Sequence, residues 1–539
     1  MMENWSASLD FPGLQQRYGT PLYLFNPEQL IQNIADFLTL VRDPANIAFP
    51  VKACPSMPVL QIISQYGLSI DCAAPTEISM ALEAGVPYRR LFYNSPDLNE
   101  EAARAILNGG GTLVLNDVEQ LTSFVHAKSE SMGKLFLRWN PDVAADGNGS
   151  ENTMTAHGRS SSQFGSAREA ILALPPSELR RIDGLHTHIG SRVKTLKLFT
   201  DALNNLHELV EAIFRLSGHR ISVLNIGGGL KLAMNDDDVC PTINEYAFSI
   251  KRIFRKNIRY IIEPGNALVG NTMGLLSSVK AIKNRPNGSR FAIIDVGSNQ
   301  LIKYTLSGIS PTVLTKEGKT IPAKGEDAVA GPLCFAGDVI LAETCLKDLQ
   351  PGDPLFIQHC GAYCMALSHQ FNGRFRPAVL TIDKDKGEYV SQMAENMWLT
   401  SPASVGLMWQ TDRSESFLQN TISVPEIFSV PAKVLSTGRT GKRSYCFDLS
   451  FRQSPGILEK LSVIFHLTKA IMVELHPEAK LSEPDGLVLL PHLEDNFRAN
   501  ETITISISVS APTPQGIRIS FGHERDLIGF YGIRLLSDS

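Results

Sequence analysis

The feature that most constrains the fold is a series of short apolar, β-rich segments that alternate with helix-like stretches in the first half of the chain. Helix-like stretches such as 76–85 and 100–110 lie between most of these segments. Eight segments occur, each ending in polar or glycine residues: 46–52, 68–72, 90–95, 112–117, 135–140, 182–190, 223–229 and 260–265. Strand–helix alternation repeated eight times is the pattern of a (β/α)8 barrel.

After about residue 281 the rhythm changes to strands with few helices between them, which predicts a second β domain beside the barrel. The strand-like opening segment 18–26 is expected to pair with that domain. Further on, 433–451 and 502–512 alternate apolar and polar residues at period two, which predicts a C-terminal β-sandwich-like extension. The expected division is 1–25 for the N-terminal strand, 26–280 for the barrel, 281–420 for the β domain and 421–539 for the C-terminal domain.

The composition is that of a soluble globular enzyme, with 43% hydrophobic residues, 19% charged residues and a net charge of −5 over 539 residues. The sequence contains no basic stripe that would favour nucleic-acid binding. It also contains no long uncharged apolar run that could span a bilayer. The N-terminus lacks a signal pattern. The eight cysteines are spread singly, and Cys360 and Cys364 have no second pair at zinc-site spacing. We therefore expect a cytoplasmic protein with reduced thiols and no metal.

Barrel enzymes keep their chemistry at the carboxyl ends of the strands. In this chain those ends carry Lys52, Asp71, Arg138, His188, Gly227–Gly229 and Glu263. Lys52 stands between Val51 and Ala53 with no other charge beside it. The alternative reading is a lysine that snorkels from a strand end. The ring of polar groups favours a nucleophile instead, an amine whose pKa is lowered by partial desolvation.

Seven motifs then follow one another in the sequence. They are PVKA (50–53), DCAAPTEI (71–78), HTHIGS (186–191), NIGGGL (225–230), EPGNALV (263–269), GPLCFAGD (331–338) and GAYCMALSHQFNGRFRPA (361–378). A glycine triplet or an EPG alone would be weak evidence, but their joint order is specific. Over residues 18 to 400 the chain resembles the fold-type III pyridoxal-phosphate decarboxylases, the group of diaminopimelate decarboxylase and ornithine decarboxylase.

The resemblance implies roles for the residues at the cofactor. Lys52 would hold pyridoxal phosphate as a Schiff base, His188 would stack on the pyridine ring, and Glu263 would hydrogen-bond the pyridine nitrogen. The remaining cofactor-binding positions that it implies are Asp71, Arg138, Ser191, Gly227, Gly228, Gly229, Gly265, Asn266 and Tyr363, with Glu77 also bracing the mouth. The alternatives are a core histidine at 188 and a plain tight turn at 227–229. His186 is expected to point to the other side of its strand.

Cys334 matches the cysteine that enters from the neighbouring subunit and handles the proton after CO₂ leaves. This implies a homodimer with shared active sites, and the alternative is a buried structural thiol.

Four positions depart from the family pattern. Asn266 stands where the family usually has arginine. Lys303 and Ser307 stand where diaminopimelate decarboxylases have arginine and tyrosine. Phe335 stands where they have glutamate and ornithine decarboxylases have aspartate, the acid that grips the distal amine. Lys303, Ser307 and Phe335 are therefore the candidate substrate-binding residues.

These positions predict a pyridoxal-phosphate-dependent α-decarboxylase for an unusual amino acid, neither diaminopimelate nor ornithine, in secondary metabolism. The alternatives are an amino-acid racemase or epimerase, which shares the cofactor and the barrel, and a non-catalytic pyridoxal-phosphate-binding protein. The motifs at 331–338 and 361–378 favour the decarboxylase.

Overall fold

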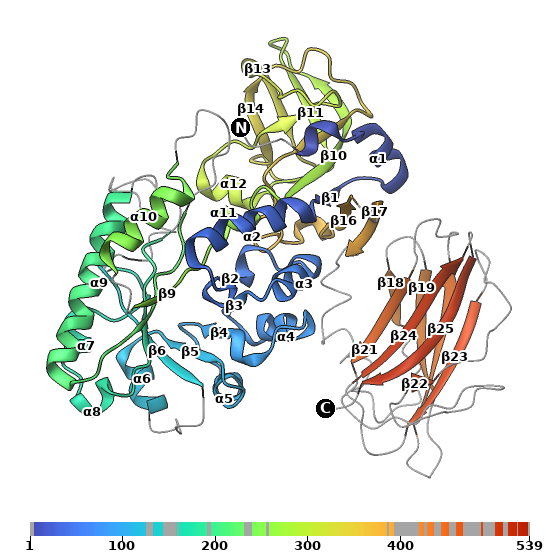
Figure 1. The fold of residues 1–539 in the computed structure, drawn as a ribbon. Coiled ribbons are helices and arrows are strands. Elements are labelled where there is room, and N and C mark those ends of the chain that lie inside the picture. Colours follow the sequence, from blue (N-terminus) through green and yellow to red (C-terminus); the bar gives the residue numbers. More distant parts are fainter. Residues whose placement is uncertain are drawn as a thin grey trace. The chain divides into compact units, whose positions relative to one another are not determined.

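The computed structural model describes residues 5–125, 133–143, 158, 161–190, 196–230, 240–254, 258–384 and 387–392, together with eight C-terminal strands between 420 and 536. The chain divides into two compact units. One comprises Met1–Asn372 and Arg376–Met393, and the other Gly373–Phe375 and Ala394–Ser539. Figure 1 shows the barrel and the β domain of the first unit.

The predicted barrel is confirmed. Its strands are hydrogen-bonded in sequence order and are all parallel: β2 (Ala48–Pro50), β3 (Ser69–Cys72), β4 (Leu91–Asn94), β5 (Thr112–Leu115), β6 (Lys134–Arg138), β7 (Gly184–His186), β8 (Val223–Asn225) and β9 (Arg259–Ile261). A parallel bridge between Ile47 and Ile262 joins the first strand to the last.

Helices cover the outside of the barrel (Figure 1). They are α2 (Pro27–Val41), α3 (Met57–Gln65), α4 (Pro75–Glu83), α5 (Glu100–Asn108), α6 (Val118–Val125), α7 (Arg168–Leu172), α8 (Pro176–Leu179), α9 (Leu196–Ser217) and α10 (Ile243–Ile253). Helix α2 begins where the side chain of Asn26 accepts hydrogen bonds from the N–H groups of Glu28 and Gln29. Proline at the first helical position strengthens this start, since its missing N–H would have no partner there.

The inside of the barrel is built in two layers. The lower layer is an apolar cluster of Ala48, Phe92, Val114, Phe136 and Ile261. Successive side chains of a strand alternate between its faces, so residues two positions further along share the same inward face. Those residues include Asn94, Arg138 and Glu263, and all three are buried. The apolar layer therefore supports a polar layer at the carboxyl ends of the strands.

The β domain is a mixed sheet in the order β14-β13-β11-β10-β1-β16-β17, with β15 pairing with both β10 and β12. Its strands are β1 (Leu22–Phe25), β10 (Met273–Asn284), β11 (Arg290–Ile294), β12 (Val313–Leu314), β13 (Ala323–Ala330), β14 (Val339–Thr344), β15 (Pro354–Ile357), β16 (Ala378–Asp383) and β17 (Gly387–Gln392). The opening strand β1 pairs with β10 and β16. Strand β10 begins at Met273, so the sheet starts before the expected boundary at 281.

Three short helices accompany this sheet: α1 (Phe11–Tyr18), α11 (Asn266–Val269) and α12 (Ile302–Ser307). Helix α1 packs on the sheet through Phe11, whose ring stacks on Phe356 of β15 at 4.9 Å between centroids.

The second unit contains two four-stranded antiparallel sheets. One has the order β18 (Asn420–Val424), β19 (Phe428–Leu435), β20 (Arg443–Phe451) and β23 (Thr502–Val509). The other has the order β21 (Lys460–His466), β24 (Gly516–Glu524), β25 (Leu527–Leu536) and β22 (Leu487–Val488). In the register of β20 with β23, Tyr445, Phe447 and Leu449 pair with Ile507, Ile505 and Ile503.

Within the described residues, no helix is both long and apolar enough to span a bilayer.

Candidate active site

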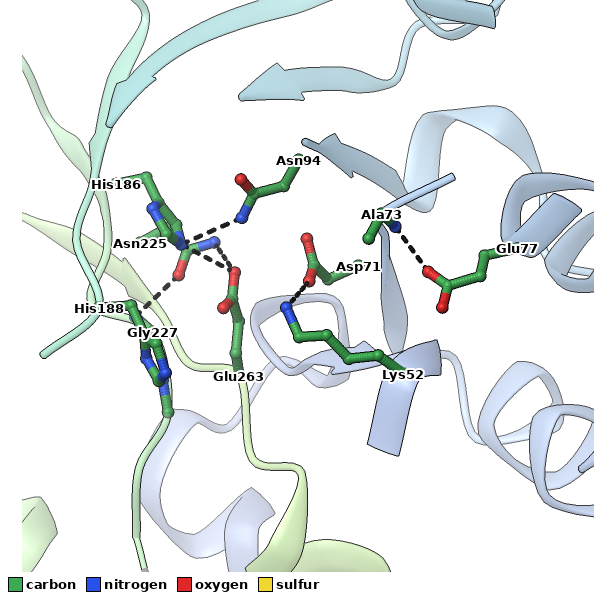
Figure 2. A network of polar contacts seen from close by, with 11 residues as sticks. Lys52, Asp71, Ala73, Glu77, Asn94, His186, His188, Asn225, Gly227 and Glu263 are labelled. Carbon is green, nitrogen blue, oxygen red and sulfur yellow. Dashed lines mark hydrogen bonds and ion pairs between the residues drawn. The ribbon is translucent and has the colours of Figure 1, made fainter. Parts of the chain in front are cut away.

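Lys52 lies in a single 3-10 turn, Val51–Ala53, that follows strand β2. Its side chain is 49% exposed, and its Nζ lies 3.4 Å from Oδ2 of Asp71 (Figure 2). Burial of the surrounding mouth lowers the pKa of Lys52, but the charges of Asp71 and Glu263 outweigh this and the pKa is raised. The expectation of a lowered pKa was therefore wrong, because the sequence does not show how close two carboxylates come to the amine.

Asp71 is fully buried on strand β3. Burial and the nearby charge of Glu263 raise its pKa to about 7, although Lys52 opposes that change. Its Oδ1 is buried and has no hydrogen-bond partner in the described chain. Glu77 of α4 faces the backbone instead, where its Oε2 accepts a hydrogen bond from the N–H of Ala73 at 2.6 Å. Glu77 therefore supports the turn after β3 and does not bond Lys52 directly.

Glu263 follows strand β9 and is 6% exposed. Both of its described donors contact the same oxygen, Oε1: the Nδ2 of Asn225 at 2.7 Å and the Nε2 of His186 at 3.3 Å (Figure 2). Burial raises the pKa of Glu263, but the contact with His186 and the nearby Lys52 and His188 more than offset it, and the pKa is lowered. The carboxylate is therefore ionised at neutral pH.

His186 was expected to point to the other side of its strand, and that expectation was wrong. It ends strand β7, is 1% exposed and contacts Glu263 inside the barrel. His186 lies two residues from Gly184, where an added Cβ would come 2.5 Å from the Phe136 ring of the apolar layer. The period-two rule applied to Gly184 would have placed His186 inside. Asn94 and Asn225 were missed as well, and the same rule finds them.

The glycine loop packs against the other site residues. A Cβ at Gly227 would come 2.5 Å from the carbonyl oxygen of Thr187, and one at Gly228 would come 2.1 Å from that of Glu263. The N–H of Gly227 donates to Asn225 Oδ1 at 3.0 Å, and that of Gly228 donates to His188 Nδ1 at 3.2 Å. Glycine is thus required at 227 and 228 by close backbone packing.

Two other glycines leave backbone donors for an anion. The N–H groups of Gly229 and Gly265 make no hydrogen bond to any described residue. A Cβ at Gly265 would come 2.8 Å from the hydroxyl of Tyr363, so that hydroxyl lies directly beside Gly265. The N–H of Tyr363 donates to the carbonyl of Ala53 at 2.7 Å, which ties the 361–378 segment to the turn that carries Lys52. Asn266 follows as the first residue of α11.

Arg138 ends strand β6 and is 6% exposed. Its guanidinium lies over the ring of Phe164, 4.4 Å from the centroid. Burial lowers the pKa of Arg138 to about 10, although Glu263 and Asp71 oppose that change. Arg138 therefore remains a cation that balances the two carboxylates of the mouth.

The candidate substrate residues on α12 are bonded within the protein. Lys303 donates from Nζ to the carbonyl of His359 at 2.8 Å and lies 4.8 Å from the centroid of the Tyr304 ring. The hydroxyl of Ser307 donates to the carbonyl of Tyr304 at 3.2 Å.

Cys334 and Phe335 lie on an exposed turn, and no described hydrogen bond or ion pair joins that turn to Lys52 or Glu263. Asp338 holds the turn through hydrogen bonds from the N–H of Ser298 at 2.6 Å and that of Leu333 at 2.8 Å. The N–H of Cys334 donates to Asn372 at 2.8 Å. Because Cys334 is exposed, the alternative that it is a structural thiol buried within this chain is excluded. Ser191 lies outside the described residues.

These residues fit pyridoxal phosphate. Lys52 presents an accessible amine, Glu263 keeps Oε2 without a partner in the described chain, and Gly229 with Gly265 offers backbone donors for a phosphate. No group of three or more histidine, cysteine or acidic residues able to hold a metal occurs in the part of the chain that the structure describes.

Residues 28–270 match the family model described as "Pyridoxal-dependent decarboxylase, pyridoxal binding domain". The chain is 29% identical over 399 residues to a diaminopimelate decarboxylase of Zymomonas mobilis, covering 71% of this chain and 92% of that relative. The resemblance to the fold-type III pyridoxal-phosphate-dependent decarboxylases is confirmed. Pyridoxal phosphate is the cofactor of this decarboxylase, and an amino acid is its substrate.

Other proteins similar to this decarboxylase are decarboxylases too. It is 27% identical to a diaminopimelate decarboxylase of Methanothermobacter thermautotrophicus, covering 70% of this chain and 90% of that relative. A solved diaminopimelate decarboxylase from Helicobacter pylori, complexed with L-lysine, shares its fold with a TM-score of 0.66 and 21% identity, covering 73% of this chain and all (100%) of the other. A Chlorella virus arginine decarboxylase bound to agmatine also shares the fold, with a TM-score of 0.57 and 20% identity over 67% of this chain and 95% of the other.

Proposed function

We propose that this decarboxylase removes the α-carboxylate of an amino acid whose distal end carries no ammonium group, so that neither diaminopimelate nor ornithine is its natural substrate. The observation that carries this proposal is Phe335, which is 53% exposed and follows Cys334 directly. By the family resemblance, this is the position of the acid that grips the distal amine.

A phenyl ring cannot replace that acid. A hydrogen bond to a charged group contributes about 1.5–3 kcal/mol, and Phe335 offers only a weaker cation–π contact to an ammonium. Burying a phenyl ring against an apolar group contributes a similar amount, about 1.5–3 kcal/mol. Phe335 therefore favours an apolar, aromatic or uncharged distal end.

Two further contacts support the same conclusion. In diaminopimelate decarboxylases the counterparts of Lys303 and Ser307 are arginine and tyrosine. Here Lys303 donates to the carbonyl of His359, and Ser307 to that of Tyr304. A distal carboxylate would have to displace these bonds, and lysine lacks the two-pronged geometry with which arginine holds a carboxylate.

We assign the cofactor-binding roles as follows. Lys52 binds the cofactor covalently and Glu263 holds a proton on its ring nitrogen. His188 would contact the ring, and the N–H groups of Gly229 and Gly265 would hold the phosphate. When bound, pyridoxal phosphate supplies an electron sink for the bond that breaks. Asp71 stabilises the positive charge of Lys52 until the amine loses its proton.

Cys334 donates the proton that replaces CO₂, and it acts in the site of the neighbouring subunit. Supporting this, Cys334 is exposed in a single chain and has no described bond to its own chain's Lys52. Around it Phe335 and Phe371 are 53% and 46% exposed, and Phe371 adjoins Asn372, which binds the backbone of Cys334. An exposed apolar surface of this kind favours a protein partner. The partner that we propose is a second copy of this chain.

The test is a panel of amino acids incubated with the cofactor-loaded protein, with CO₂ release and the product amine as readouts. The panel contains diaminopimelate, ornithine, lysine, and amino acids with aromatic, apolar and amide distal ends. We expect kcat/KM to be highest for an uncharged distal end. Efficient turnover of diaminopimelate or ornithine would refute the substrate assignment, and α-proton exchange without CO₂ release would indicate a racemase instead.

A further inference from the structure

The carboxylate of Glu263 is held asymmetrically. Asn225 and His186 both contact Oε1, and Oε2 has no hydrogen-bond partner in the described part of the chain. Two donors on one oxygen fix the rotation of the carboxylate. They also satisfy part of the charge of Glu263 without blocking Oε2.

His186 is the unusual member of this pair. It is 1% exposed, and burial lowers its pKa even though Glu263 opposes that change. The ring is therefore neutral at neutral pH and carries a single N–H. Since Nε2 is the atom that faces the carboxylate, the proton lies on Nε2 and Nδ1 is the lone-pair nitrogen.

The contact between Asn94 and His186 fits this tautomer if the side-chain amide of Asn94 is flipped, so that its oxygen and nitrogen exchange places. The Nδ2 of Asn94 is placed 3.5 Å from Nε2 of His186, and Oδ1 of Asn94 is buried without a partner. Exchanging the amide atoms places the oxygen beside the Nε2–H of His186, which removes a donor–donor contact. Asn94 and Glu263 then share one proton donor, and His186 cannot rotate without losing both contacts.

We propose that His186 is a positioning residue that, together with Asn225, holds Glu263 ionised and aimed through Oε2 at the ring nitrogen of the cofactor. This inference rests on the proposed function, in which Glu263 keeps a proton on that nitrogen. His186 acts through Glu263 and does not need to touch the cofactor. A protonated Glu263 could not accept the proton of the ring nitrogen, so loss of the His186 donor weakens cofactor binding selectively at low pH.

Other charged or titratable groups lie near Glu263 and could also affect its titration. They are Lys52, Asp71, Arg138, His188, Tyr246 and Tyr363. None of them donates a hydrogen bond to the carboxylate of Glu263 in the described chain. Their influence is the same in all variants at position 186. The ratio of each variant's cofactor affinity to that of the natural protein therefore isolates the effect of the donor at position 186.

The experiment measures the affinity of the cofactor-free full chain for pyridoxal phosphate between pH 5 and 9 by absorbance titration. The variants are His186→Leu, which removes the donor, and His186→Gln, which restores an N–H donor. His207→Gln on α9 is the matched control outside the barrel. We expect the affinity of His186→Leu, relative to the natural protein, to fall at least tenfold between pH 8 and pH 5.5. His186→Gln and His207→Gln should stay within about twofold of the natural protein.

A cofactor analogue with carbon in place of the ring nitrogen distinguishes the positioning role of His186 from a packing role. It has no ring proton for Glu263 to accept, so its affinity should change little in His186→Leu. A uniform loss at all pH values, or an equal loss with the carbon analogue, would overturn the proposal and leave a packing role.

If His186→Leu does not fold, Asn225→Leu removes the other donor to Oε1 and must show the same acid-side loss. Failure of the natural protein to bind pyridoxal phosphate at all would refute the proposed function rather than the role of His186.

Discussion

The ammonium nitrogen of Lys52 lies 3.4 Å from the buried Oδ2 of Asp71. Burial lowers the pKa of this lysine and the carboxylate raises it, and the carboxylate prevails. Lys52 is thus held as an ammonium until it reacts. Its pairing with Asp71 has consequences for cofactor uptake and for stability.

The first prediction concerns the rate at which Lys52 captures an aldehyde. Only the neutral amine attacks, so the capture rate by the cofactor-free protein should rise with pH. Asp71→Asn removes the largest influence that raises the pKa of Lys52 and leaves burial, which lowers it. The midpoint of the rate profile should therefore move to lower pH. Stopped-flow absorbance with pyridoxal phosphate measures it.

The control for this profile is Asp36→Asn on the exposed face of α2, where the carboxylate accepts a hydrogen bond from Gln32. Its profile should match that of the natural protein. A midpoint that stays in place in Asp71→Asn would show that Asp71 does not set the protonation of Lys52.

The second prediction concerns stability without cofactor. Burial raises the pKa of Asp71 from 3.8 to about 7, so the folded state binds this proton more tightly than the unfolded state. Its stabilising contribution is complete below about pH 4 and is lost as pH rises through about 7. One proton corresponds to a slope of up to about 1.4 kcal/mol per pH unit. Asp71→Asn should flatten the curve of unfolding free energy between pH 4 and 7, as measured by urea denaturation. Parallel curves for the two proteins would contradict it.

The third prediction concerns Phe335 and the substrate. Phe335→Glu restores an acid next to Cys334 and should raise kcat/KM for diaminopimelate and ornithine by about tenfold or more, since a charged hydrogen bond contributes about 1.5–3 kcal/mol. The change should stay incomplete because Asn266, Lys303 and Ser307 are unaltered. Phe335→Leu is the matched control, which keeps an apolar side chain and should not gain these substrates. Equal selectivity in Phe335→Glu and Phe335→Leu would place the distal end of the substrate elsewhere.

The fourth prediction concerns the shared site. Lys52→Ala and Cys334→Ala chains should each be inactive as homodimers. If Cys334 serves the partner's site, random mixing yields half heterodimers with one intact site each, and about a quarter of the natural activity returns. The two variants are mixed after reversible dissociation and assayed with the best substrate from the panel. An active monomer at the assay concentration, or no recovery after mixing, would exclude the shared site.

The barrel could be predicted because strand alternation and polar strand ends are local features of the sequence. The order of the polar layer could have been predicted too. Asn94, His186 and Asn225 each lie two residues after Phe92, Gly184 and Val223 on the inward face, and applying period two from that layer finds them. His186 was instead expected to point outside, because it was considered separately from its strand.

Other features depend on distances that no local pattern encodes. The pKa of Lys52 depends on how close Asp71 and Glu263 come across the barrel, and these residues are far apart in the sequence. The hydrogen bonds of Gly227 and Gly228 to Asn225 and His188 were likewise not foreseeable from a glycine triplet. The partner of Cys334 stays a prediction, because a contact between two chains is not determined by the fold of one.

The most direct test of the account is chemical mapping of the cofactor on the protein. The purified protein with pyridoxal phosphate should absorb at roughly 410–430 nm, as protonated imines of this cofactor do. Borohydride reduction followed by peptide mass spectrometry should then find the reduced cofactor on the peptide that contains Lys52, and Lys52→Ala should carry no label. A label on another lysine, or undiminished labelling of Lys52→Ala, would contradict the central claim that Lys52 is the residue that binds the cofactor.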